Sequence, residues 1–174
     1  MKPYQQGNLD GLCGAYAVIN AVRLISNKLN TEECQEILLT ILRFQIKRRK
    51  SVYFMIHGLN RTKITTILKQ IIRPGFDITY TTPFSKRQNL YLSELYESLF
   101  VYLNGDCKRC AIICFETKSY GHWTVVESIT ANRLNLFDSM GRHFINRKHC
   151  TTTEITPHTP ILIDFTATIF LEAK

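Results

Sequence analysis

The sequence has no long apolar run. No segment approaches the roughly 18–20 uninterrupted apolar residues that a helix needs to cross a bilayer. The N-terminal stretch MKPYQQGNLDGLCG is polar from its start and has no apolar core of the kind found in signal peptides. These absences argue against a membrane-spanning protein and predict a cytoplasmic location. Export as an effector by a non-classical route would leave no such signal.

Proline-rich linkers, internal repeats and low-complexity tracts are also missing, and the 174 residues include five prolines. A chain of this length can bury close to 70% of its unfolded surface, so it needs no disulfides or metals to fold. Hydrophobic residues make up 45% and charged residues 21%, as in ordinary globular domains. We therefore expect one domain over residues 1–174.

Cysteine is too sparse for a disulfide scaffold in a chain of this size. We expect most of the six thiols to be free, with Cys34 and Cys114 acting as small core residues. Cys107-Lys-Arg-Cys110 has zinc-knuckle spacing and His149-Cys150 follows downstream, but one Cys-x-x-Cys without a matching second pair is weak support for zinc. No metal or cofactor is expected.

Acidic residues are outnumbered by basic ones, which gives a formal net charge of +8. The excess lies in two runs, at 43–50 (RFQIKRRK) and at 61–73. Such runs attract acidic partners or nucleic acid, or they are solvated helix ends. Nucleic acid is the weaker interpretation, because no recognisable motif is present and the aromatic residues are not interleaved with the basic runs. A basic binding or interaction module without catalysis is nevertheless an alternative class of function.

Apolar spacing predicts helices in the first part of the chain. The run GAYAVINAVRLI contains no proline and indicates a largely buried helix that begins at or beside Cys13. Asn30 and Glu33 form a capping box for the next helix, and Pro74-Gly75 ends the one after it. Besides the helix at Cys13, helices are predicted over 31–49, 62–72 and 91–103.

Strand composition dominates the second part of the chain. Residues rich in β-branched and aromatic side chains alternate with short polar turns. The predicted strands cover 77–82, Ala111–Glu116, His122–Ile129, Arg133–Asp138 and Ile161–Leu171. Helices first and strands second are typical of an α+β fold, in which an N-terminal helical part packs on a C-terminal antiparallel sheet.

The first candidate site residue is Cys13, which glycines flank at positions 11 and 14. Glycine permits tight turning and close approach of a substrate. A helix N-terminus favours negative charge, and therefore the thiolate, which is the nucleophilic form of cysteine. Alone, a cysteine at a helix start is more often inert packing, so this motif needs partners elsewhere in the chain.

The partners are His122 and Asp138. His122 opens an alternating strand in Gly-His-Trp, and Asp138 ends the next strand, 16 residues later. In a hairpin with a turn near Thr130, the first residue of one strand lies opposite the last residue of the other. Asp138 can therefore accept a hydrogen bond from Nδ1–H of His122 and orient the ring. Each residue alone has an ordinary structural explanation, but the hairpin predicts their proximity.

A cysteine, an imidazole and a carboxylate are the minimum set for nucleophilic acyl transfer. Cysteine attacks a carbonyl carbon, histidine protonates the leaving group and later activates water, and the carboxylate holds the ring. The oxyanion needs a hydrogen-bond donor, for which the backbone N–H of Cys13 and the side-chain amide of Gln5 or Gln6 are candidates. These glutamines are alternatively polar residues of a loose N-terminus.

Together these residues resemble the papain-like cysteine peptidase superfamily, and are most similar to the bacteriocin-processing peptidases that cleave after a double glycine. The resemblance covers about 20 residues around Cys13 and another 20 around 120–140, but not residues 30–110. It implies a papain-like fold, a thiol protease acting on a protein or peptide, Cys13, His122 and Asp138 as the triad, and Gln6 or Gln5 at the oxyanion. The family's glutamine lies about six residues before the cysteine, where this chain has Gly7, and its transporter domain is missing here. Asp10-Gly-Leu-Cys is also similar to the Asp-Gly-x-Cys of ovarian-tumour-type deubiquitinases.

Cleavage of a peptide or isopeptide bond is thus the leading hypothesis. Glutamine deamidation, or acyl transfer to an amine in an effector or toxin, would use the same residues. The acyl-enzyme intermediate is common to these reactions, and they differ in the leaving group and the acceptor. The sequence leaves this choice open.

Overall fold

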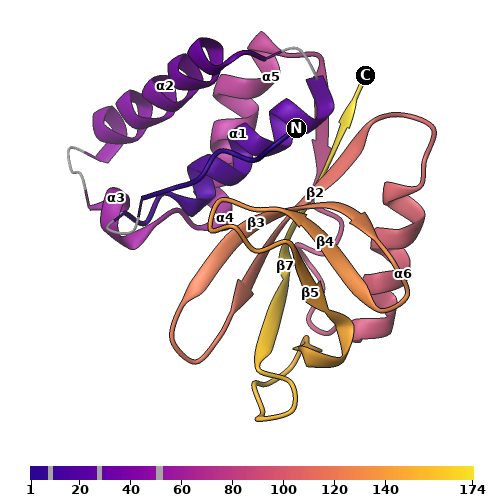
Figure 1. Ribbon diagram of the computed structural model, residues 1–174. Helices are drawn as coiled ribbons and strands as arrows, with labels where there is room; N and C mark the ends of the chain where they lie inside the picture. The colour runs from indigo at the N-terminus through magenta and orange to yellow at the C-terminus, as the bar shows by residue number, and fades with distance from the viewer. Residues whose placement is uncertain (8–9, 27–28, 50–52) are drawn as a thin grey trace.

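The computed structural model describes residues 1–7, 10–26, 29–49 and 53–174; side chains 48 and 49 lie outside this description. Helices occupy the N-terminal part of the chain, and an antiparallel sheet fills the C-terminal half (Figure 1). The mixed α/β class and the order of helices before strands are therefore as predicted.

Helix α1 (Cys13–Ser26) begins at the cysteine, as predicted, and most of its residues are buried. Helix α2 (Thr31–Arg49) starts at the predicted capping box. The Glu33 carboxylate accepts a hydrogen bond from the Asn30 N–H at 2.8 Å, and the Asn30 side chain accepts one from the Glu33 N–H at 2.9 Å. Two backbone N–H groups at the start of α2, which have no acceptor within the helix, thereby gain side-chain acceptors.

The third predicted helix is longer than its pattern indicated. Helix α4 (Arg61–Ile67) continues as the π-helical turn η1 (Leu68–Ile72) and then as α5 (Arg73–Gly75). Pro74 therefore lies in the last turn of the helical stretch, which ends at Gly75. The wider π turn changes the hydrogen-bond pattern just before Pro74, which has no N–H to donate. The short helix α3 (Phe54–His57) was not predicted.

The remaining predicted elements are present with ends shifted by up to two residues. They are β1 (Ile78–Thr81), α6 (Leu92–Leu103), β2 (Arg109–Glu116), β3 (Gly121–Ile129), β4 (Arg133–Phe137) and β7 (Ile161–Ala173). Three short elements lie outside the predictions: β5 (Phe144–Asn146), the 3-10 turn η2 (Arg147–His149) and β6 (Cys150–Thr151).

The described residues form one seven-stranded sheet with the order β1-β7-β2-β3-β4-β5. Neighbours along this path are antiparallel, and β6 joins β7 in parallel. The long strand β7 contacts β1, β2 and β6, so the C-terminal segment is central to the sheet. Strands β3 and β4, which carry the candidate histidine and lead to the candidate aspartate, lie next to each other.

The core has two parts, one on each face of the sheet. Helix α1 packs on β2, β3 and β7 on one face, with α2 and α4 behind it, and α6 packs on β2 and β3 on the other (Figure 1). Cys13, Trp123 and Val125 belong to the first part, and Phe115 and Val126 to the second. The alternation of buried residues along β3 therefore serves both faces.

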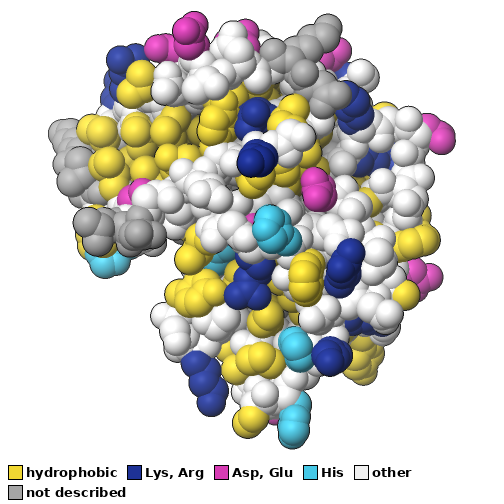
Figure 2. Space-filling model, in the orientation of Figure 1, with side chains coloured by type: hydrophobic (Ala, Val, Ile, Leu, Met, Phe, Trp, Pro, Cys, Tyr) yellow, Lys and Arg dark blue, Asp and Glu magenta, His cyan; other side chains and the backbone are white. Residues whose placement is uncertain are grey.

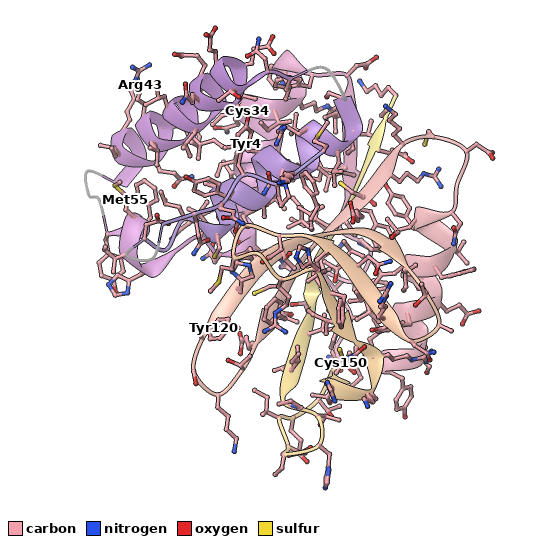
Figure 3. The ribbon with its side chains drawn as sticks, in the orientation of Figure 1. Tyr4, Cys34, Arg43, Met55, Tyr120 and Cys150 are labelled. Carbon is pink, nitrogen blue, oxygen red and sulfur yellow. The ribbon has the colours of Figure 1, made fainter. Side chains whose placement is uncertain are left out.

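The described helices include none that combines the length and the apolar character needed to span a membrane. The basic run at 43–50 falls on the end of α2, where Arg43 and Lys47 are exposed (Arg43 is labelled in Figure 3). The side chains of residues 48–50 lie outside the described residues. In the run at 61–73, Arg61 is half-buried and donates to the carbonyls of Thr166 at 2.7 Å and Ser85 at 3.4 Å, so part of this run is structural.

Candidate active site

Cys13 is the first residue of α1 and is 9% exposed. The loop before it is held by Asp10, whose carboxylate accepts hydrogen bonds from the Leu12 N–H at 3.0 Å and the Gly7 N–H at 2.9 Å. The first N–H groups of a helix have no intrahelical partner. Cys13 therefore presents its thiol and backbone N–H at a helix N-terminus.

The two glycines beside Cys13 permit close packing. Gly11 donates its N–H to the Met55 carbonyl at 2.6 Å, and a Cβ on Gly11 would overlap the Ile56 carbonyl oxygen. A Cβ on Gly14 would lie 3.1 Å from Leu59 and 3.4 Å from Trp123. Tight backbone approach at both positions, rather than positive φ, therefore explains these glycines.

Nε2 of His122 lies 2.6 Å from Oδ1 of Asp138, and both side chains are buried. The predicted proximity of the two residues is thus present, with two corrections. Asp138 accepts from Nε2 and not from Nδ1. Asp138 also lies diagonally from His122 and not directly opposite it. Val125 pairs with Phe137, so Asp138, the next residue along the chain, lies opposite Thr124. Strand β3 extends past the end of β4, and diagonal neighbours on one face remain within reach.

The Asp138 carboxylate is fully engaged by donors. Oδ1 faces His122, while Oδ2 accepts the backbone N–H groups of Met140 at 2.9 Å and Arg142 at 3.0 Å. Burial alone would raise the pKa of Asp138, but the hydrogen bonds and the positive charge of His122 outweigh burial and lower it. Asp138 is therefore an anion that fixes the imidazole.

The other side of the imidazole meets Cys13. Burial alone would lower the pKa of His122, but hydrogen bonds to Asp138 and Cys13, and their negative charges, raise it to about 9. Since Nε2 is used by Asp138, Nδ1 is the ring nitrogen left for the sulfur. The structure therefore brings Cys13, His122 and Asp138 together, with a proton favoured on the ring.

The two candidate glutamines differ in their surroundings. The Gln6 backbone N–H donates to the Ser139 carbonyl at 3.0 Å, and its Oε1 accepts from the Ser139 hydroxyl at 3.2 Å. Gln5 is exposed, and its side-chain nitrogen lies near Gly141. Gln6 is thus tied to the residue after Asp138, with its Oε1 occupied and its NH₂ group turned away from Ser139.

Three positioning residues were missed by the sequence reasoning: Asp10, Asn20 and Ser139. Buried Asn20 accepts from the Tyr4 N–H at 2.9 Å and donates to the Tyr4 carbonyl at 3.1 Å. These bonds hold the N-terminal segment along α1, where Figure 3 shows Tyr4 beside the helix. A polar residue within the apolar run of α1 was the available signal for Asn20. Asp10 lies in the Asp-Gly-x-Cys motif noted above, which carried no expectation of a positioning role, and Ser139 follows Asp138 without a distinctive pattern.

The Cys-x-x-Cys motif has no metal-site geometry. Cys107 is exposed and contacts Glu172 at 3.7 Å, whereas Cys110 is buried against the Ala21 carbonyl at 3.9 Å. Cys34, Cys110 and Cys150 are buried and Cys114 is half-buried. Within residues 1–7, 10–26, 29–49 and 53–174, no group of three potential metal ligands is present.

The geometry thus pairs an imidazole with a carboxylate, brings the thiol at the start of α1 next to that imidazole, and holds the Gln6 side chain against Ser139. Comparison of the chain with models of protein families, with curated proteins and with solved structures gives no match.

Proposed function

We propose that this protein is a thiol-dependent hydrolase, a cysteine peptidase that cleaves a peptide or isopeptide bond through an acyl-enzyme intermediate. One observation carries the proposal: the His122 imidazole joins the Asp138 carboxylate to the Cys13 thiol. Buried ion pairs are costly unless they are well satisfied. Here the carboxylate is satisfied by three donors, and the remaining ring nitrogen faces a nucleophile at a helix start.

The reaction follows from where the protons lie. The Cys13 sulfur, as thiolate, attacks the carbonyl carbon, and His122 donates its proton to the leaving nitrogen as the C–N bond breaks. The amine departs and a thioester remains on Cys13. Water then attacks the thioester while His122 takes one of its protons. The C–S bond breaks, and the carboxylic acid is released with the enzyme regenerated.

The tetrahedral intermediate needs donors aimed at its oxygen. The backbone N–H of Cys13 is one, because first-turn N–H groups lack intrahelical acceptors. Gln6 is the better second donor of the two glutamines. Its Oε1 is held by Ser139 at 3.2 Å, which turns the NH₂ group the other way. Gln5, exposed beside Gly141, has no such anchor among the contacts described above.

The papain-like fold belongs to this proposal as well. A helix that starts at the cysteine packs against an antiparallel sheet whose neighbouring strands β3 and β4 lead to the histidine and the aspartate. This is the arrangement that the resemblance to bacteriocin-processing peptidases implies for the chain. Peptide cleavage is ranked above deamidation because of that resemblance, and the three side chains fit both.

Alkylation of the thiols tests the proposal directly. Cys107 is exposed, whereas Cys13 is buried beside His122. Limiting iodoacetamide at pH 6 should label Cys13 before Cys107, because the imidazole of His122 activates Cys13 in the proposed mechanism, whereas Cys107 contacts the Glu172 carboxylate. Peptide mass mapping measures the order, and a His122→Ala variant should lose the preference. Labelling of Cys107 first would contradict the proposal.

Turnover gives the second test. Cys13→Ala should abolish cleavage of a mixed peptide library, and the matched Cys107→Ala variant should leave it intact. Circular dichroism should show that both variants are folded, since each change removes a single sulfur atom. Release of ammonia from glutamine-bearing proteins without chain cleavage would favour deamidation instead.

A further inference from the structure

We infer that Arg142 and Tyr120 form a binding site for a carboxylate on the leaving-group side of the scissile bond. This inference rests on the proposed function, since it names the substrate class for the same site. The substrate would carry an acidic side chain or its own C-terminal carboxylate shortly after the bond that is cleaved.

The first observation is the state of the Arg142 guanidinium. Its side chain is half-buried, its Cζ lies 5.4 Å from the Phe115 ring centroid, and one of its nitrogens donates to the Tyr120 hydroxyl at 3.4 Å. In the described part of the chain, no carboxylate lies within ion-pair distance of it. A guanidinium presents a fork of donors that suits a carboxylate.

The second observation is the position of this pair relative to the imidazole. Phe115 contacts the His122 ring edge-on with centroids 5.4 Å apart, and Arg142 lies over the same phenyl ring. Tyr120 precedes His122 by two residues. Cys13, in contrast, meets the imidazole through the helix start. The order of contacts is therefore sulfur, imidazole, phenyl ring and guanidinium.

The chemistry of the reaction assigns this side to the leaving group. The acyl carbon bonds to the sulfur, and the departing nitrogen accepts its proton from His122. The leaving group thus lies on the imidazole side, toward Arg142. The imidazole and the guanidinium each lie 5.4 Å from the centroid of the Phe115 ring. The distance between them is therefore at most about the length of three extended residues. The carboxylate would accordingly belong to one of the first three residues after the scissile bond.

The surface around Tyr120 is open to a ligand. Tyr120 is 40% exposed and lies at the end of the turn between β2 and β3, where Figure 3 labels it. In the space-filling view, the outline of the molecule is indented between α3 and the β2–β3 hairpin (Figure 2). A peptide can approach the hairpin from this indentation without displacing a described helix.

The test compares two alkylating agents that differ in charge. Iodoacetyl-triglycine carries a carboxylate three residues beyond its reactive carbon, and its C-terminal amide is the neutral analogue. At 0.15 M salt, Arg142→Gln should lower the ratio of their rates at Cys13 by about ten-fold, the scale of a contact with a charged group, and Arg142→Lys should retain part of it. Arg133→Gln is the matched control, because Arg133 also lies over a ring, that of Phe144, at the opposite end of β4. An unchanged ratio in Arg142→Gln would overturn the inference.

A peptide experiment then locates the carboxylate. A mixed library is offered with free C-termini and again with amidated C-termini, and the cuts are mapped by mass spectrometry. Loss of cleavage on amidation indicates the chain terminus; retained cleavage before Asp or Glu indicates an acidic side chain. Cuts that ignore downstream carboxylates would overturn the inference. If no peptide is cut, peptidase activity fails as a proposal, while the alkylation ratio still decides whether Arg142 binds anions.

Discussion

At the scale of single residues, the chemistry of the site depends on the charge of Asp138. Its carboxylate is buried, accepts from Nε2 of His122 at 2.6 Å and helps to raise the pKa of that ring to about 9. In the proposed reaction, the imidazolium protonates the leaving group. Activity should therefore be retained up to the pKa of His122 and lost as the pH rises through it.

Asp138→Asn removes the charge but keeps an oxygen that can accept a hydrogen bond. The pKa of His122 should fall toward its ordinary value of 6.5, because an adjacent carboxylate shifts such a group by about one to three units. The alkaline limb of the kcat/KM profile should then move down by about two units, with a loss of about ten-fold at pH 8.

The control for this prediction is Asp77→Asn. Asp77 is an exposed carboxylate whose partner is Lys174 at 3.7 Å, so its neutralisation should leave the profile unchanged. An alkaline limb that does not move in Asp138→Asn would show that another group protonates the leaving amine.

The proximity of His122 and Asp138 could be predicted from the sequence, but the atoms that meet could not. Local motifs and a hairpin interval indicated Cys13, His122 and Asp138 as candidates. Which ring nitrogen faces Asp138 depends on the rotation of the His122 side chain. The spacing of residues along the sequence carries no information about this rotation. The contact between Gln6 and Ser139 depends on the path of the N-terminal segment, which Asn20 fixes through two hydrogen bonds to Tyr4.

At the scale of elements, the start of α1 is positioned by the segment that contains α3. Gly11 donates to Met55, and its α-carbon lies against the backbone of Ile56 and Gly58. Gly11→Ala should therefore push the loop before Cys13 away from this segment. We expect a loss of about 1–3 kcal/mol in the free energy of unfolding, together with a fall in kcat. Urea denaturation and peptide cleavage measure the two effects.

Gly75→Ala is the matched control for the Gly11 variant. A Cβ on Gly75 would meet nothing within 4 Å, so the same change of residue should leave both stability and activity near those of the parent chain. Equal losses in the two variants would mean that backbone conformation, and not the contact with α3, explains Gly11.

Elements with strong periodicity were predictable, whereas short ones were not. The apolar run of α1 and the capping box at Asn30 gave correct helix starts. Strands β5 and β6 have three and two residues, too few to display an alternation. The π turn before Pro74 depends on how that stretch is hydrogen-bonded, which the apolar pattern of residues 62–72 does not encode.

At the scale of the whole molecule, the site joins two distant parts of the chain. Cys13 comes from the helical part, while His122 and Asp138 come from the sheet, and burial surrounds the contact between them. The pairing of these segments is therefore coupled to folding itself. A titration at the contact should be visible in the stability of the entire domain.

The stability of the folded chain should fall at alkaline pH. The pKa of His122 is raised from 6.5 to about 9 in the folded state, so its contribution is complete below pH 6.5 and is lost as the pH rises through 9. Asp138 has a lowered pKa relative to 3.8, so its contribution is complete above about pH 4 and is lost on acidification.

Between pH 6 and 10, the free energy of unfolding should drop by on the order of 3 kcal/mol. Urea midpoints across this range measure the drop, which should be much smaller in His122→Ala and unchanged in His158→Asn, where an exposed histidine is replaced. A flat stability profile in the parent chain would mean that folding does not raise the pKa of His122, and the alkaline limit predicted for activity would have to be abandoned with it.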